Sequence, residues 1–314
     1  MIATRALPGL RLSLRFARFE LGFIGGLIVL VTAATLLVAR ELHALAPPAI
    51  CFGPYEVPPA GCEAASQAFY EYQNRFQGPL LALLIGVPLL AGGLIGVTLV
   101  AREVERGTAR LAWSLSPSRV RWYWARLLPT LLLFSALAMM AAIGADQLAA
   151  AARPDIDMSR SFDGFGTRGV VLAGRVIFVL AIAVLVGAIM GRVLPAILVT
   201  AVIATVGISG GSSVHQMILR GEAIVLEDFD WTAGDMYVDQ AFRLPDGSLV
   251  TWEYFEGRSE PYDQDGNPIY PEVIIGVLGE RYGFAQLREI GALLAASAGF
   301  LLLGLIVTNR RRPD

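Results

Sequence analysis

Six long runs of apolar residues, separated by shorter polar segments, make up most of this chain. A helix needs about twenty apolar residues to cross the roughly 30 Å hydrocarbon core of a bilayer. The runs therefore predict membrane-spanning helices at residues 21–38, 79–101, 127–149, 170–190, 193–208 and 290–307. Because a helix satisfies its own backbone hydrogen bonds in lipid, the pattern predicts an all-α polytopic membrane protein with six transmembrane helices.

The polar segments divide the chain into four regions. They are residues 1–20, an interfacial helix; 21–208, spans one to five, with an outer loop at 40–78 and a polar connection at 101–127; 209–289, a cap-like segment outside the membrane; and 290–314, the sixth span with an Arg-rich tail. In the first region, Arg11, Arg15 and Arg18 share one helical face, and Leu and Phe cover the rest. This pattern is typical of a helix that lies in the membrane interface.

The region 209–289 carries turn signals that predict β-structure. The stretch "AFRLPDGSLVTWEYF" places two apolar runs around Pro-Asp-Gly, which favours a β-hairpin. The stretch "YDQDGNPIY" contains a second turn signal of this kind. Asp263, Asp265 and Asn267 resemble the start of a calcium-binding loop, but the Gly is misplaced and the twelfth position lacks Glu, so a plain turn is favoured.

Composition agrees with a membrane protein, since 55% of the 314 residues are hydrophobic and only 17% are charged. In a soluble domain, about a quarter of the residues are charged. The first apolar run follows an Arg-rich start, and Ala44-Leu45-Ala46 resembles a signal-peptide cleavage site. Its length of about 18 residues exceeds the ~7–15 of a signal peptide, so we interpret it as a retained span.

Charge predicts the orientation. With the N-terminus inside, the inner segments hold more than half of the 25 basic residues, all arginine, but only four of the 27 acidic ones. Positive charge marks cytoplasmic loops. Both termini are therefore expected in the cytoplasm. Cys51 and Cys62 then fall in the outer loop, where the compartment is oxidising, and a disulfide is favoured over two free thiols.

Recognisable catalytic chemistry is missing from the sequence. The only histidines, His43 and His215, lie in the predicted outer segments without ligands at metal-binding spacing, and no protease or hydrolase motif occurs. The absence of lysine excludes a Walker A nucleotide site in this sequence. Asp146 lies about one turn from the outer surface, where a hydrated carboxylate is favoured over a proton relay. A non-catalytic protein is expected, without a metal, a cofactor or a nucleic-acid partner.

Close contacts between helices are predicted at pairs of glycines four residues apart. The pairs are Gly22/Gly26, Gly92/Gly96 and Gly187/Gly191. Small residues at this spacing let membrane helices approach closely. The spans are otherwise apolar, with no evident buried charge.

The polar connection 101–127 has the caps of a helix, a turn and a second helix. The second span is expected to stop near Gly107, and Thr108 is a plausible N-cap of a short helix. Ser116 is expected to cap the next helix with Pro117 in its first position. Arg119, Arg121, Arg126, Trp122 and Trp124 would then mark the inner membrane interface.

The residue order in this connection resembles a known family. "ARE-x-E-x-GT-x5-S-x-SPSR-x4-WARL" is similar to the first cytoplasmic loop of the permease subunits of ABC-2 type ABC transporters. The six spans, the interfacial N-terminal helix and the large outer segment before the last span also resemble that family. So does "ERYGFAQLREIG", which is similar to a Tyr…Gln-x-x-Glu stretch of bacterial members. One departure is the extended outer segment with its cysteine-bearing first loop, which resembles an extracellular cap.

The resemblance implies a short coupling helix that sits against a separate ATPase subunit. The implied coupling residues are Glu103, Glu105, Gly107, Thr108, Arg110, Leu111, Trp113, Leu115, Ser116, Pro117 and Arg119. Glu103 and Glu105 would position the loop through charge pairs. Two ATPase copies, which would hold ATP and Mg, and a second permease chain, identical or homologous, are expected in a bacterial cell membrane.

Two classes of function remain open at this point. The first is an ATP-driven exporter of an amphiphilic or lipophilic substrate, such as a drug, an antibiotic, a peptide or a lipid-like molecule. The alternative is a membrane sensor or assembly factor whose outer segment binds a ligand or partner without transport. Recruitment of an ATPase would distinguish them.

Overall fold

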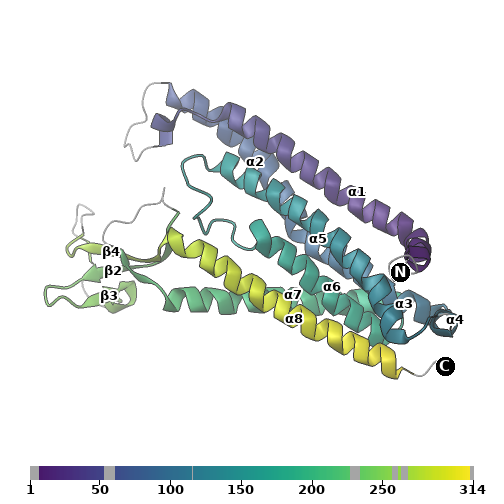
Figure 1. Ribbon diagram of the computed structural model, residues 1–314. Coiled ribbons are helices and arrows are strands. Elements are labelled where there is room, and N and C mark those ends of the chain that lie inside the picture. The colour runs from purple at the N-terminus through teal and green to yellow at the C-terminus, as the bar shows by residue number, and fades with distance from the viewer. Residues whose placement is uncertain are drawn as a thin grey trace.

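The computed structural model describes residues 7–52, 61–114, 116–226, 234–256, 261–262 and 268–311. Within these ranges, six helical stretches are long and apolar enough to cross a membrane, which confirms the predicted all-α polytopic class. They run side by side as an elongated bundle (Figure 1). A small β-sheet extends from one end of it, here called the sheet end. Helix α1 begins and α8 ends at the opposite end, here called the α4 end.

The first half of the chain supplies three spans. Helix α1 (Leu7–Leu45) is followed by a short 3-10 turn, η2 (Ala49–Phe52). The second span consists of α2 (Cys62–Val87), a π-helical segment η3 (Pro88–Leu94) and α3 (Ile95–Glu105). The short helix α4 (Ala109–Ser114) then leads to α5 (Arg119–Ala152), the third span.

The second half supplies three more spans and the sheet. Helices α6 (Gly169–Met190) and α7 (Val193–Gly221) are joined by two residues, and Gly191 adopts a φ of +63° at this turn. Strands β1 (Ile224–Leu226), β2 (Met236–Arg243), β3 (Leu249–Thr251) and β4 (Glu272–Val277) form an antiparallel sheet in the order β1–β4–β2–β3. Two 3-10 turns, η5 (Trp252–Phe255) and η6 (Gly279–Arg281), follow β3 and β4, and α8 (Tyr282–Arg310) is the last span.

The predicted hairpin is confirmed. Strands β2 and β3 pair across the Pro-Asp-Gly turn, where Gly247 has a φ of +83° and donates its N–H to the Leu244 carbonyl. Strand β4 is paired on both sides, between β1 and β2. The possible calcium loop at Asp263, Asp265 and Asn267 lies outside the described residues.

Helices extend into the predicted outer loop 40–78 from both sides. Helix α1 continues to Leu45, and α2 already begins at Cys62, so most of this segment is helical. The helices extend because they still pack against each other beyond the apolar runs. Leu42 and Phe69 are fully buried in a cluster with Leu148 of α5. Hydropathy marks where a helix leaves lipid, whereas side-chain packing carries the helix further.

Helices also extend into the segment 209–289. Helix α7 runs thirteen residues past the predicted end of the fifth span, to Gly221, and α8 begins at Tyr282. His215 and Glu289 are therefore helical residues that face the bundle and not parts of a separate cap. The non-helical region between the two helices is confined to the sheet and its connections.

Helix α6 occupies the centre of the bundle. It packs against α3, η3, α5, α7 and α8, and most of its apolar positions are buried. The closest approaches involve predicted glycines: a Cβ on Gly92 would lie 2.8 Å from Leu180 N, and one on Gly187 would lie 2.9 Å from Val97 O. Gly22 and Gly26 of α1, in contrast, have no described atom beyond the adjacent backbone of their own helix within 4 Å of an added Cβ. The glycine pattern is therefore a packing feature of η3, α3 and α6.

Candidate functional site: the α4 end of the bundle

Helix α3 ends where the sequence predicts. Gly107 has a φ of +69°, and its N–H donates to the Val104 carbonyl (3.1 Å) in the turn that ends α3. Thr108 directly precedes α4, but its hydroxyl donates to Glu103 Oε2 (2.7 Å). The turn is thus tied back to the helix that it leaves.

Helix α4 is the predicted short helix, and one of its faces is fixed to the bundle. Trp113 is buried and meets Trp122 of α5 edge to face, with ring centroids 6.1 Å apart. The Arg119 guanidinium lies 4.4 Å from the centre of the Trp113 ring. Leu111, in contrast, is 63% exposed. Leu115 and the side chain of Arg110 lie outside the described residues.

The cap of α5 differs from the prediction. Ser118, not Ser116, is the N-cap: its backbone is extended, and its hydroxyl oxygen accepts from the Arg121 N–H (3.1 Å). Ser116 instead donates its N–H to the Trp113 carbonyl, so it belongs to the turn that closes α4. Pro117 accordingly precedes the cap and is not the first helical residue.

The two glutamates of this segment hold other elements of the same chain. Glu103 forms an ion pair with Arg126 of α5 (3.0 Å), and both side chains are about one fifth exposed. The resemblance implied a charged partner for Glu105. Its carboxylate instead accepts a hydrogen bond from the Val193 N–H (3.0 Å) at the start of α7. A carboxylate is favourable at a helix N-terminus because unpaired N–H groups point toward it.

Further arginines bring the remaining helices into this network. Arg102 pairs with Glu20 of α1. Arg119 donates from Nη1 to the Asn309 carbonyl (2.9 Å) and the Arg311 carbonyl (2.7 Å) at the end of α8. Arg311 in turn donates to the Ala188 carbonyl of α6 (2.6 Å). Cations are favourable beside unpaired carbonyls at helix C-termini. All six spans are thereby joined by polar contacts at the α4 end.

The sequence did not identify Arg311 or the carbonyl partners of Arg119. A basic residue directly after a helix was the available signal for Arg311. No local pattern links Arg119 to a carbonyl 190 residues away. That contact arises because α5 begins beside the end of α8 (Figure 1).

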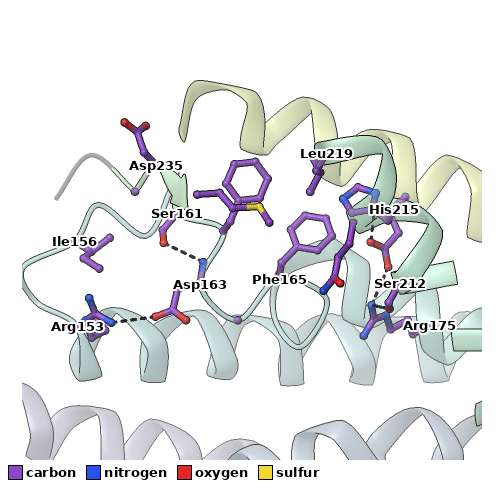
Figure 2. Close-up of a pocket in the computed structure, with 16 residues that line it drawn as sticks. Arg153, Ile156, Ser161, Asp163, Phe165, Arg175, Ser212, His215, Leu219 and Asp235 are labelled. Carbon is purple, nitrogen blue, oxygen red and sulfur yellow. Dashed lines mark hydrogen bonds and ion pairs between the residues drawn. The ribbon is translucent and has the colours of Figure 1, made fainter. Parts of the chain in front are cut away.

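The sheet end holds a second polar cluster, which the sequence analysis missed. Arg175 of α6 donates to Glu289 of α8 (2.9 Å) and to Ser212 of α7 (3.0 Å), and His215 Nδ1 lies 3.9 Å from Glu289 Oε2. Figure 2 shows Arg175, Ser212 and His215 converging beside Phe165. The expectation of spans without buried charge is therefore wrong, because three helices bring these residues together.

The Tyr…Gln-x-x-Glu stretch contributes to this cluster. Tyr282, Gln286 and Glu289 lie in the first turns of α8, and Gln286 Nε2 donates to the Tyr282 hydroxyl (2.7 Å). The nearby Asp146 is partly exposed and pairs with the buried Arg168 (3.0 Å). Among the described residues, no group of three or more His, Cys, Asp or Glu is arranged to hold a metal ion.

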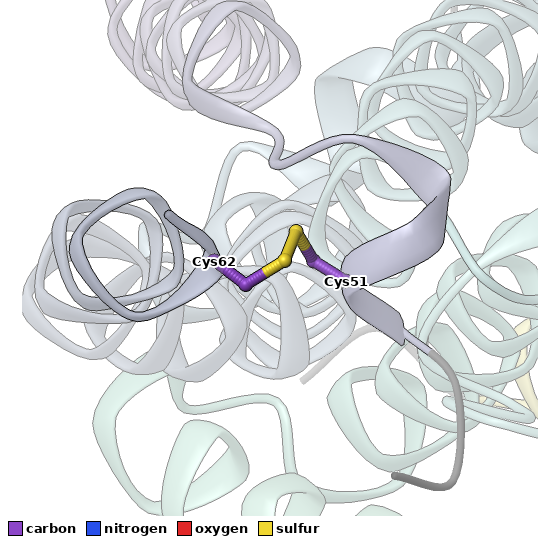
Figure 3. The surroundings of a disulfide bond; sticks show 2 residues. All are labelled: Cys51 and Cys62. Atoms are coloured by element: carbon purple, nitrogen blue, oxygen red, sulfur yellow. A yellow bond between two sulfur atoms is a disulfide. The ribbon is translucent and has the colours of Figure 1, made fainter. Parts of the chain in front are cut away.

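The predicted disulfide is present at the sheet end. Cys51 and Cys62 are bonded, and their Cα atoms are 5.5 Å apart (Figure 3). The bond links the turn η2 to the first residue of α2. Phe52 next to it meets the buried Phe69 edge to face, with centroids 6.4 Å apart. The bridge therefore fixes the connection between the first two spans against the cluster around Phe69.

Removing the disulfide is expected to lower the free energy of unfolding by about 2–3 kcal/mol. The bond closes a short loop and thereby restricts the unfolded chain, and this restriction is lost when the bond is removed. Thermal unfolding of the purified chain with and without a reductant measures the effect. The variant Cys51→Ser/Cys62→Ser should unfold at the lower temperature in both conditions. An unchanged unfolding temperature of the wild type on reduction would contradict the prediction.

Comparison with known families identifies the chain. A family model described as ABC-2 membrane transporter related matches residues 24–211, which is more than half of the 314 residues. No curated protein and no solved structure matches the chain. The matched region extends from α1 through the α4 end into α7. The chain therefore belongs to the ABC-2 membrane transporter related family and is a multi-pass membrane permease component of an ABC transporter.

Proposed function

We propose that the chain is the membrane subunit of an ATP-driven exporter and that α4 docks onto a separate ATPase subunit. The ATPase would hold ATP and Mg, consistent with the absence of lysine from this sequence. Two ATPase copies and a second permease chain would complete the transporter. The largely apolar, lipid-compatible spans favour an amphiphilic or lipophilic substrate.

The observation that carries this proposal is the two-sided character of α4. On one side, Trp113 is buried against Trp122 and covered by Arg119. Leu111, two residues away on the same short helix, has 63% of its surface exposed. A short helix with a fixed base and an exposed leucine suits a partner with an apolar cleft, because the partner's motion then acts on an anchored element.

The polar network supplies a route for such motion. A displacement of α4 would act on α3 through the Glu103–Thr108 contact and on α5 through the Trp113–Trp122 contact. It would act on α8 through Arg119. This connectivity supports coupling of an ATPase to several spans at once.

The charge distribution supports a cytoplasmic position for α4. Helix α1 begins and α8 ends at the α4 end (Figure 1), where arginines are abundant and acids few. Basic residues are retained on the cytoplasmic side of a membrane, where ATP is available. The sheet and the disulfide would then lie on the opposite, oxidising side.

Docking is tested by Leu111→Asp, which places a charge on the exposed face of α4. We expect it to reduce the ATPase that co-purifies with the chain by more than tenfold, because a buried, unpaired carboxylate opposes the interface. Leu249→Asp is the matched control, since Leu249 is also exposed but lies on β3 at the sheet end. Equal ATPase recovery with both variants would refute docking through α4. If the wild type recruits no ATPase, the sensor or assembly function is favoured instead.

A further inference from the structure

The region between α7 and α8, residues 222–281, is strongly acidic. It contains 14 of the 27 acidic residues of the chain but only three of the 25 basic ones, so its formal net charge is −11, whereas the whole chain carries −2. A surface of one charge sign attracts partners of the opposite sign and repels copies of itself. The charge of this region therefore favours a cationic partner.

One face of the sheet carries an exposed tryptophan over a buried aromatic base. Phe242 of β2 is fully buried, and Trp252 of η5 lies against it with ring centroids 6.0 Å apart. Tyr262 contacts both rings, with centroids 5.9 Å from Phe242 and 5.8 Å from Trp252. Trp252 nevertheless keeps 52% of its surface exposed. A tryptophan that is held by its neighbours but open to solvent is typical of a contact residue in an interface.

A carboxylate lies on the same face of the sheet. Glu272 of β4 is the direct partner of Phe242 in the β2–β4 register, so the two side chains project from one face. The Glu272 residue is exposed, and its carboxylate accepts a hydrogen bond from the Tyr262 hydroxyl (2.6 Å). This bond raises the pKa of Tyr262, so the hydroxyl keeps its proton and remains the donor. The residues Trp252, Tyr262 and Glu272, here called the Trp252 face, thus present two aromatic rings beside a negative charge.

The basic residue of the sheet lies away from the Trp252 face. Arg243 is the one basic residue among those described from β1 to β4. It follows Phe242 in β2, and because successive side chains of a strand alternate, it projects from the other face. Glu253 in η5 and Glu256 directly after it are both exposed, close to Trp252 in the chain. The side chain of an arginine or lysine would therefore meet aromatic rings and carboxylates here without a competing cation on this face.

The position and charge of the sheet argue against a membrane or a second copy of the chain as the partner. Helix α7 continues for thirteen residues beyond its apolar run, which is about 20 Å at 1.5 Å per residue, and the sheet lies beyond its end (Figure 1). Anionic lipid headgroups repel an acidic surface. A second copy would bring the same negative charge. A cationic partner in solution is favoured over both.

The backbone next to Trp252 favours a peptide over a small amine. Strand β3 (Leu249–Thr251) directly precedes Trp252, and in the sheet order β1–β4–β2–β3 it pairs only with β2 among the described strands. An edge strand has unpaired backbone N–H and C=O groups, which an extended peptide can join. A small amine has no backbone to offer, whereas a basic peptide matches the edge, the rings and the charge together.

We propose that the Trp252 face binds cationic peptides on the side of the membrane opposite to α4. Basic side chains of the peptide lie on the Trp252 and Tyr262 rings and pair with Glu272, because a cation is attracted by an aromatic face and by a carboxylate. The peptide backbone runs beside β3. This inference goes beyond the proposed export function and is tested on the chain alone, so failure of docking through α4 would leave it unaffected.

The test uses three hexapeptides that separate charge from aromatic content: alternating Arg-Trp, alternating Glu-Trp and alternating Arg-Ser. Their binding to the full chain in phosphatidylcholine nanodiscs is measured by titration calorimetry at pH 7.5 and low salt, with empty nanodiscs subtracted. We expect the Arg-Trp peptide to bind at least tenfold more tightly than either of the others, and its affinity to fall with added salt. No binding of the Arg-Trp peptide, or equal binding of the Arg-Trp and Glu-Trp peptides, would overturn the proposal. Equal binding of the Arg-Trp and Arg-Ser peptides would refute the role of the aromatic rings.

Two variants locate the binding. Trp252→Ala should weaken binding of the Arg-Trp peptide at least tenfold, and Glu272→Gln, which keeps an oxygen acceptor for Tyr262, at least fivefold. Glu71→Gln on α2 is the matched control, because Glu71 is also exposed and also accepts a side-chain hydrogen bond, from Gln67 (3.0 Å). If Trp252→Ala does not fold, Glu272→Gln decides the question. A Glu272→Gln variant that binds the peptide as tightly as Glu71→Gln would contradict the assignment.

Discussion

Replacement of Gly96 by alanine is expected to lower the free energy of unfolding by about 1–3 kcal/mol, the usual cost of overpacking. A Cβ at this position would lie 2.6 Å from Ala183 Cβ and 2.8 Å from the Leu180 carbonyl oxygen of α6. The carbonyl belongs to the backbone of the central helix, so it cannot move aside as a flexible side chain would. Helices α3 and α6 must separate instead, which also loosens the packing around them. Thermal unfolding of the purified chain in detergent measures the effect.

Gly22→Ala provides the matched control. Gly22 lies in α1, where no described atom beyond the adjacent backbone of its own helix lies within 4 Å of an added Cβ. Both substitutions gain the same helix propensity, roughly 0.5–1 kcal/mol, so only the contact with α6 distinguishes them. Gly22→Ala should leave the unfolding temperature unchanged or raise it slightly. A similar decrease in both variants would show that the close contact at Gly96 is not what limits stability.

If α4 couples the spans to an ATPase as we propose, loss of the Arg119 side chain is expected to reduce ATP-driven transport at least tenfold. Arg119→Ala removes two charge-assisted hydrogen bonds to the end of α8 and the cation–π contact with Trp113. Hydrogen bonds to charged groups contribute about 1.5–3 kcal/mol each, and a tenfold change requires about 1.4 kcal/mol. Helix α4 would remain present but would no longer be clamped to α8. Transport and ATP hydrolysis, measured together in reconstituted vesicles, should therefore become uncoupled.

Arg121→Ala removes the same charge two residues away. The Arg121 side chain is exposed and has no hydrogen bond or ion pair among the described residues, so transport should be retained. Arg119→Lys should rescue only part of the activity, because an ammonium lacks the planar fork of a guanidinium. If Arg119→Ala and Arg121→Ala reduce transport equally, the loss of a positive charge causes the effect, and not the loss of the contacts between Arg119 and the end of α8.

Local sequence signals predicted local features well. The apolar runs predicted the number of spans, Pro-Asp-Gly predicted the β2–β3 hairpin, and the position of Cys51 and Cys62 in one outer loop predicted the disulfide. The stop at Gly107 and the short helix after it were also predicted from neighbouring residues. The cap of α5 was missed by two positions, because Ser116 and Ser118 flank the same proline and only the backbone conformation distinguishes them.

Helix ends were the least predictable feature of the fold. Hydropathy measures transfer into lipid, whereas a helix continues in water as long as its side chains pack. Leu42, Phe69 and Leu148 come from three helices, and their mutual burial extends α1 and α2 beyond the predicted spans. The extension of α7 likewise moved His215 from an expected outer segment into the bundle.

The sequence by itself determined that the chain spans a membrane six times, that its polar connection forms a short helix, and that its cysteines pair. These properties depend on residues that are close together along the chain. Only the tertiary structure decided that Arg175 pairs with Glu289, 114 residues away, and that Arg119 binds the end of α8. Charge and hydrogen-bonding capacity are properties of single residues, but burial and partnership are created by the elements that pack around them.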